Sequence, residues 1–192
     1  GAIPDVPVYL NSPMSINVTE LFCDNRVEHK LSPEVCHLVC GVAKYVRTVD
    51  ESKALNEKKG PMVIISANGM ISGGRILHHI AEFGPKESTT IILPGYQAVG
   101  TRGRSLFQGA KTLRIFGADV SIRARVESID GLSAHADSNG LIAWLKRIPA
   151  PPKKVFVTHG EPDAAEALCK LIHEELGFAC EVPRMNQKVA LV

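Results

Sequence analysis

The chain has 192 residues, a formal net charge of +2, 45% hydrophobic and 22% charged residues. With ordinary glycine and proline contents, this composition indicates a soluble globular protein that is long enough for one large or two small domains. No apolar stretch reaches the roughly 18 residues that a membrane-spanning helix needs, so we expect no membrane partner. The chain opens on Gly1-Ala2 without a methionine, and we expect it to be a piece of a longer protein.

Basic residues concentrate in the middle of the chain. Residues 60–128 carry eight Lys and Arg against four acidic residues, whereas seven basic residues face eight acidic ones both before and after this stretch. A mild excess of basic over acidic residues usually means only that these side chains lie on a solvated surface. Three of its arginines, Arg75, Arg102 and Arg104, fall in glycine-rich stretches, and this position favours contact with phosphate groups.

The five cysteines are an odd number and include no C-x-x-C pair: Cys23, Cys36, Cys40, Cys169 and Cys180. Several of them sit in apolar helical patterns. We expect them to be buried thiols in a reducing cytoplasm, rather than zinc ligands or disulfide partners.

Short apolar runs alternate with amphipathic stretches along the first 118 residues. In chain order we expect a strand at 6–10, helices at 15–24 and 32–43, a strand at 45–49, a helix at 51–58, a strand at 62–66, a helix at 75–83, a strand at 89–94, a helix at 104–109 and a strand at 112–116. Apolar strands that alternate with helices predict an α/β fold with a mainly parallel sheet covered by helices.

The pattern changes near Asp119. Residues 120–129 alternate apolar and polar side chains, as a strand with one solvated face does. A helix at 138–147, a strand at 154–157, a helix at 162–176 and strands at 179–182 and 188–192 are expected to follow. We place a domain boundary near residue 118, in the turn formed by Gly117, Ala118 and Asp119.

A first glycine-rich loop, residues 66–75, joins a predicted strand to a helix. Its candidate ligand-binding residues are Ser66, Gly69, Gly73, Gly74 and Arg75. Ligands of open parallel sheets bind beyond the carboxyl ends of the strands, and glycines let backbone N–H groups approach an anion closely. The loop contains neither a Walker A motif nor G-x-G-x-x-G, so a plain tight turn is an equal alternative for this loop alone.

A second loop, residues 95–104, follows the next predicted strand. Its candidate residues are Gly100, Thr101, Arg102, Gly103 and Arg104. The planar fork of arginine can hold phosphate oxygens through two hydrogen bonds. Two neighbouring strand ends that carry glycines, hydroxyl groups and arginines predict one phosphate-binding rim, and for the two loops together we favour anion binding.

Two histidines follow predicted strands in the last third of the chain. His135 can act as an acid or base near neutral pH, and Asp137 can either orient it or cap the next helix. His159 precedes Gly160 and occupies a common position for a zinc ligand. Either histidine alone is also typical of an ordinary surface residue, and one imidazole is not a zinc site.

Together and in this order, these motifs resemble the β-CASP family of metallo-β-lactamase-fold nucleases, which includes ribonuclease J and the endonuclease subunit of the cleavage and polyadenylation specificity factor. The similarity covers nearly the whole chain. Besides the loops and histidines it includes Pro7-Val-Tyr-Leu-Asn-Ser12-Pro13-Met14 and Glu51-Ser52-Lys53-Ala-Leu-Asn56. The resemblance implies that residues 1–118 form the β-CASP domain, and that residues 119–192 form the C-terminal segment of a metallo-β-lactamase αββα domain.

The resemblance also implies roles for the candidate residues. His135 matches the family's presumed general acid, with Asp137 beside it, and His159 matches its last metal ligand. In the parent enzyme two zinc ions would support hydrolysis of an RNA phosphodiester while the glycine loops hold the flanking phosphates. RNA, expected as a single strand, is the implied partner, with a second copy of the chain as a further candidate.

The largest departure from the family is the absence of its H-x-H-x-D-H metal loop from this sequence. We therefore expect the C-terminal part of a nuclease, with weak zinc binding and little activity of its own. Asn68 replaces a small residue of many relatives, a change that can alter hydrogen bonding in the first loop.

Two other functions remain as alternatives. A non-catalytic RNA-binding β-CASP protein is one, although intact His135 and His159 argue against it. An unrelated nucleotide-binding α/β protein is disfavoured, because Walker and dinucleotide-binding motifs are missing. The sequence leaves open whether cleavage is endo- or exonucleolytic, and whether the substrate is RNA or DNA.

Overall fold

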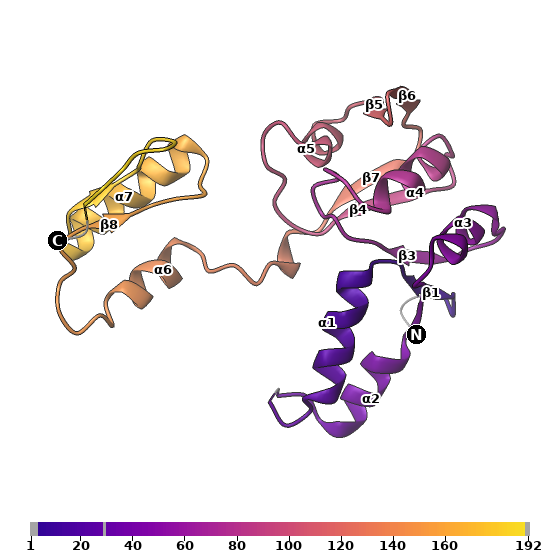
Figure 1. Ribbon diagram of the computed structural model, residues 1–192, viewed down its shortest axis with the longest axis horizontal. Helices are drawn as coiled ribbons and strands as arrows, with labels where there is room; N and C mark the ends of the chain where they lie inside the picture. The colour runs from indigo at the N-terminus through magenta and orange to yellow at the C-terminus, as the bar shows by residue number, and fades with distance from the viewer. Residues whose placement is uncertain (1–3, 29, 191–192) are drawn as a thin grey trace. The chain divides into compact units, whose positions relative to one another are not determined.

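A computed structural model describes residues 4–28 and 30–190. The chain divides into two compact units, Gly1–Ser133 and Ala134–Val192. The first unit contains, in order, β1 (Val8–Leu10), α1 (Pro13–Asp24), α2 (Pro33–Gly41), β2 (Ala43–Tyr45), α3 (Val49–Glu57), β3 (Val63–Ile65), α4 (Ile76–Phe83), β4 (Thr90–Leu93), α5 (Arg102–Phe107), β5 (Thr112–Ile115), β6 (Ala118–Ser121), β7 (Arg125–Ser128) and the 3-10 turn η1 (Asp130–Leu132). The second unit contains α6 (Ser138–Leu145), β8 (Val155–Phe156), α7 (Pro162–Leu176) and β9 (Cys180–Glu181) (Figure 1).

Strand pairing is mainly parallel, as the sequence predicts for this α/β chain. β1 lies between β2 and β3 in one parallel sheet, and β4–β7 and β8–β9 are parallel pairs. The carboxyl ends of β1, β2 and β3 therefore lie at one edge, and the first glycine loop starts there.

One pairing differs from the expected parallel arrangement. β5 and β6 form an antiparallel hairpin. Its turn contains Phe116 and Gly117, whose φ angles of 49° and 79° are both positive, and two such residues in succession suit a tight hairpin turn. This local turn brings β5 against the strand that follows it directly.

Three predicted strands are shifted, divided or missing. The strand expected at 45–49 ends at Tyr45, because Thr48 and Glu51 form a capping box that starts α3. The strand expected at 120–129 is divided into β6 and β7, between which Ile122 and Ala124 enter the core. Of the strand expected at 188–192, residues 188–190 are in no strand and residues 191–192 lie outside the described part.

The first compact unit extends beyond the expected domain boundary. β7 pairs with β4, and Ile122 is buried in the core of the same unit. This packing holds residues 119–133 in the first unit. A compact unit is defined by its internal packing, whereas a family domain is defined by sequence similarity, and the two need not have the same bounds. The domain boundary near residue 118 therefore stays a prediction.

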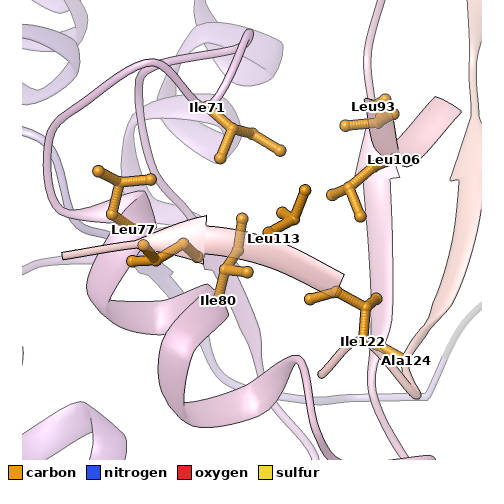
Figure 2. Packing of buried hydrophobic residues seen from close by; sticks show 9 residues of the cluster. Ile71, Leu77, Ile80, Leu93, Leu106, Leu113, Ile122 and Ala124 are labelled. Carbon is orange, nitrogen blue, oxygen red and sulfur yellow. The ribbon is translucent and has the colours of Figure 1, made fainter. Parts of the chain in front are cut away.

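Each unit has its own hydrophobic core. Figure 2 shows side chains from the glycine loop, α4, α5, β4, β5 and the segment between β6 and β7 in the core of the first unit: Ile71, Leu77, Ile80, Leu93, Leu106, Leu113, Ile122 and Ala124. Ile115 of β5 belongs to the same cluster. In the second, buried residues of α6, β8 and α7 and their flanks pack together: Ile142, Leu145, Val157, Ala165 and Ile172. No helix in the described ranges is long and apolar enough to cross a membrane.

The expectation of five thiols is wrong for four of the cysteines. Cys23 pairs with Cys40 and Cys169 with Cys180, at Cα–Cα distances of 6.1 and 5.4 Å. The pairs form because α1 packs against α2 and α7 packs against β9, so partners that are separated in sequence come within disulfide range. Cys36 is buried and belongs to neither of these two pairs.

A buried polar network joins the strand ends to helices α3 and α4. The fully buried Asn11 follows β1, and its Nδ2 donates to Ser52 Oγ and lies 2.7 Å from His79 Nε2. The other ring nitrogen of His79 lies 2.7 Å from Asn56 Oδ1. Asn11 Oδ1 accepts a hydrogen bond from Arg75 Nη1. Every one of these buried groups therefore has a polar partner, as a stable interior requires.

Burial lowers the pKa of His79 from 6.5 to about 4, and electrostatic interactions with His78 and Arg75 act in the same direction. The imidazole is therefore neutral in the folded protein at neutral pH. In this form it can accept one hydrogen bond and donate another.

We expect the first unit to lose stability as the pH falls from about 6.5 to about 4. The unfolded chain binds the proton at a pKa near 6.5, while folded His79 resists it down to about 4, so the stabilisation is complete above the unfolded pKa. It decreases by about 3 kcal/mol when the pH reaches ~4. Urea unfolding across this pH range measures the effect. The control is His79→Gln, and an identical pH dependence for both proteins would contradict the prediction.

Candidate functional site

The structure places the two glycine loops against each other. The N–H of Gly103 donates to the carbonyl of Met70 at 3.0 Å. Arg102 Nη1 donates to the carbonyl of Ile71 at 3.4 Å. Residues 66–75 and 95–104 thus form one continuous surface feature, which we call the loop pair.

Two glycines of the loop pair are required by packing. A Cβ on Gly103 would lie 1.7 Å from Gln97 Oε1, and one on Gly74 would lie 3.2 Å from the carbonyl oxygen of Ala67. Gly74 also has a φ of +79°, which disfavours any side chain there. These two positions let the loops approach each other and turn back on themselves.

The other three candidate glycines border open space. A Cβ on Gly69, Gly73 or Gly100 would meet nothing within 4 Å. No described residue accepts a hydrogen bond from the N–H groups of Gly69 and Gly73. These donors lie shortly before the N-terminus of α4, where the helix dipole favours a negative charge.

The hydroxyl and amide side chains of the loops hold the backbone in place. Ser66 Oγ donates to the carbonyl of Asn11 at 3.0 Å. Thr101 Oγ1 donates to the carbonyl of Ala98 and accepts from the N–H of Arg104, so it caps α5. Asn68 Oδ1 accepts from the N–H groups of Met70 and Ser72 at 3.0 and 3.5 Å. Asn68 therefore takes part in the loop's hydrogen bonding.

The three candidate arginines have different surroundings. Arg75 donates to Asn11 Oδ1 and to the carbonyls of Val46 and Arg47 at 2.6–2.9 Å. Arg102 Nε donates to the carbonyl of Arg114 at 2.6 Å. Both guanidinium groups are thus engaged with protein oxygens.

Arg104 differs because its Nε is buried and has no hydrogen-bond partner among the described residues. Its guanidinium carbon lies 5.8 Å from the centroid of the Phe107 ring. A buried donor of a charged group without a partner is unfavourable. No described residue accepts a hydrogen bond from the two Nη groups of Arg104 either. Of the three arginines, Arg104 is therefore the one whose Nη groups are left to bind an anion from outside the chain.

His135 and Asp137 lie between η1 and α6, where both are exposed. Asp137 is the N-cap of α6, and its Oδ1 accepts from the N–H of Gly140 at 2.7 Å. The capping role, one of the two alternatives for Asp137, is therefore present. Its second alternative, orienting His135, stays a prediction, as does the acid role of His135.

His159 follows β8 and is also exposed. Its φ of 64° lies in the left-handed region, which histidine enters more often than most residues other than glycine. Residues 4–28 and 30–190 contain no group of three or more His, Cys, Asp or Glu side chains that could hold a metal ion. The described residues around His159 therefore do not form a complete zinc site, and the role of His159 as a metal ligand stays a prediction.

Sequence reasoning missed Asn11 and His79 as parts of the site's framework. Asn11 lies in one of the motifs that match the family, and the sequence pattern indicates no role for His79. An available signal was the run Asn11-Ser12, because it places two polar residues directly after an apolar strand. Asn56 and Ser52, from a second matching motif, are their partners.

Comparison with known proteins identifies two family domains in the chain. Residues 1–106 match the Beta-Casp domain, and residues 119–183 match the Zn-dependent metallo-hydrolase RNA specificity domain. The chain is 35% identical over 178 residues to a ribonuclease of Thermus thermophilus, an alignment that covers 88% of this chain and 40% of that protein. It is 33% identical over 194 residues to an RNase J-like protein of Methanocaldococcus jannaschii, covering 95% and 42%.

A further relative is the transcription termination factor FttA of Thermococcus kodakarensis, which is 29% identical over 155 residues, with 78% of this chain and 24% of that protein covered. The chain spans about two fifths of the length of the two ribonuclease-type relatives. The two matched domains follow each other in the order that the sequence motifs predict. The chain therefore belongs to the β-CASP family, and it also contains the Zn-dependent metallo-hydrolase RNA specificity domain.

Proposed function

We propose that the whole protein hydrolyses RNA phosphodiester bonds with zinc, and that this chain supplies RNA phosphate binding, a general acid and one metal ligand. The observation that carries the proposal is the loop pair, joined by the hydrogen bond from Gly103 to Met70. It presents open glycine backbone, and it includes Arg104, whose guanidinium group has no hydrogen-bond partner among the described residues. Backbone N–H groups and arginine are the usual ligands of phosphate oxygens.

The proposed division of labour among the arginines follows from their contacts. Arg104 binds phosphate directly through its Nη groups, because no oxygen of the described residues accepts a hydrogen bond from its guanidinium group. Arg75 and Arg102 contribute positive charge to the surface and hold the loops through carbonyl oxygens. The loops read the backbone of a single strand, since these donors are complementary to phosphates rather than to base edges.

The proposed chemistry involves His135 and His159. Zinc, when bound by the whole protein, supplies an activated water for hydrolysis. His159 provides one imidazole ligand, and His135 donates a proton to the 3′-oxygen that leaves. Asp137 contributes by fixing the start of α6 next to His135.

The setting of the protein is also part of the proposal. We propose that it acts in the cytoplasm and that two copies associate as a homodimer. Light scattering during size-exclusion chromatography measures the mass directly, and a monomeric mass at micromolar concentration would overturn the dimer.

Arg104→Ala should weaken the binding of single-stranded RNA roughly tenfold, because one charge-assisted hydrogen bond is lost. The slope of log affinity against log salt concentration should become shallower by about 0.7. Fluorescence anisotropy over a salt series measures both quantities.

The matched control is Arg123→Ala, which removes an exposed arginine that pairs with Glu87 outside both loops. It should leave the affinity nearly unchanged. Equal losses for the two variants would show that only overall charge matters, and that the loop pair is not the binding surface.

The chain alone should retain far less than one zinc ion per molecule after dialysis against a mild chelator. A single imidazole lacks the several ligands that give a zinc site its affinity, and the described residues form no such cluster. Atomic absorption spectroscopy of the dialysed chain measures the zinc content. A stoichiometric amount would refute the prediction that the ligands lie mostly elsewhere.

In the whole protein, His159→Ala should reduce both zinc content and RNA cleavage. His135→Ala should leave the zinc in place while turnover falls about 10²–10⁴-fold, the usual contribution of a general acid. Metal analysis and single-turnover cleavage of the same preparations separate the two roles. Equal zinc loss in both variants would contradict the assignment, and zinc-loaded protein that binds RNA without cleaving it would favour a non-catalytic RNA-binding function.

A further inference from the structure

Both ends of the first glycine loop are tied to Asn11. At its start, Ser66 Oγ donates to the carbonyl of Asn11 at 3.0 Å, and the N–H of Asn11 donates to the carbonyl of Ile65 at 2.8 Å. At its end, Arg75 Nη1 donates to Asn11 Oδ1 at 2.7 Å. One fully buried residue therefore fixes where this loop leaves β3 and where it enters α4.

His79 in turn fixes the side chain of Asn11. A guanidinium group can only donate hydrogen bonds, so the atom of Asn11 that faces Arg75 is the amide oxygen. The amide nitrogen then faces Ser52 Oγ and His79 Nε2, each at 2.7 Å. His79 Nε2 must accept this hydrogen bond, which leaves the ring proton on Nδ1, opposite Asn56 Oδ1 at 2.7 Å.

We propose that Asn11 and His79 are positioning residues for RNA binding, and that they hold the loop of residues 66–75 through Arg75 only while the imidazole is the neutral Nδ1–H tautomer. The inference rests on the proposed function, in which this loop contacts RNA phosphates. Neither side chain touches the RNA, since both are more than nine-tenths buried.

Protonation of His79 would place two donors, Nε2–H and the Asn11 amide, opposite each other at the present distance of 2.7 Å. The titratable or charged groups that interact with the ring, His78 and Arg75, are on or beside its own helix. The groups that face it from β1 and α3 are the neutral Asn11 and Asn56. On α3, Glu51 interacts electrostatically with Arg75, and its carboxylate accepts hydrogen bonds from the N–H groups of Arg47 and Thr48. Burial without an opposing carboxylate keeps the ring neutral, so the loop stays held at neutral pH.

A set of single variants tests this positioning role. His79→Leu removes the hydrogen-bond acceptor for the side-chain amide of Asn11. Because Asn11 then holds the loop of residues 66–75 less firmly, binding of single-stranded oligouridine should weaken roughly tenfold. The salt slope should stay unchanged, because no phosphate contact disappears. His79→Gln restores an amide oxygen that can accept from Asn11, so it should recover most of the affinity. His78→Leu, at the adjacent exposed position of α4, is the matched control and should bind like the unaltered chain.

Nitrogen-15 NMR of the histidine rings provides a readout that a purely structural role would not move. His79 should show protonated Nδ1, unprotonated Nε2 and no titration between pH 5.5 and 7.5. Asn11→Asp replaces the opposing donor with a carboxylate that can accept from His79 Nε2–H, Ser52 and Arg75 together, so the pKa of His79 should rise above its ordinary value.

The results distinguish this inference from the proposed function. An Nε2–H tautomer, an unshifted His79 pKa in Asn11→Asp, or equal RNA affinity of His79→Leu and His78→Leu would each overturn the positioning role. A shallower salt slope in His79→Leu would overturn it too, because a phosphate contact would then be involved. The unaltered chain could also bind no RNA while His79 shows the expected tautomer and pKa. In that case the proposed function would be wrong, and the positioning role in RNA binding would be wrong as well.

Discussion

The fully buried side chain of Asn11 is the constraint on which the rest of the candidate site depends. Its amide meets Arg75, Ser52 and His79, while its backbone N–H and carbonyl meet Ile65 and Ser66. A buried amide must satisfy all of these groups at once, because each unpaired one would cost free energy. The end of β1, the loop after β3 and the helices α3 and α4 are consequently held in one arrangement.

This arrangement leaves the loop pair with two kinds of residue. The first kind holds the loops together by close packing and by hydrogen bonds to protein atoms: Gly74, Gly103, Ser66, Thr101, Arg75 and Arg102. The second kind is available to a ligand. Three glycines border open space, namely Gly69, Gly73 and Gly100, and Arg104 has a donor without a partner among the described residues. A site that is fixed before the ligand arrives loses less freedom on binding. The rigid network thus favours phosphate binding by the few groups that remain available.

Local sequence signals predicted the parts of the fold that depend on local geometry. Helix α7 has the bounds that its Pro162 and the glycine after Leu176 indicate, and both glycine loops follow strands because such turns need glycine nearby in sequence. Contacts between distant residues could not be predicted in this way. Arg75 looked like a phosphate ligand, but its partners Asn11 and Val46 lie 64 and 29 positions away. The disulfide pairs, the antiparallel β5–β6 pairing and the role of His79 likewise depend on tertiary packing or on turn geometry that composition does not reveal.

Photo-crosslinking can show whether RNA lies against the loop pair. Single-stranded RNA that carries 4-thiouridine would be irradiated with the purified chain, and the modified peptides would be identified by mass spectrometry. We expect crosslinks concentrated in residues 66–75 and 95–104 that disappear at high salt. Crosslinks confined to α1, α2 or the second compact unit, with none in either loop, would contradict this expectation.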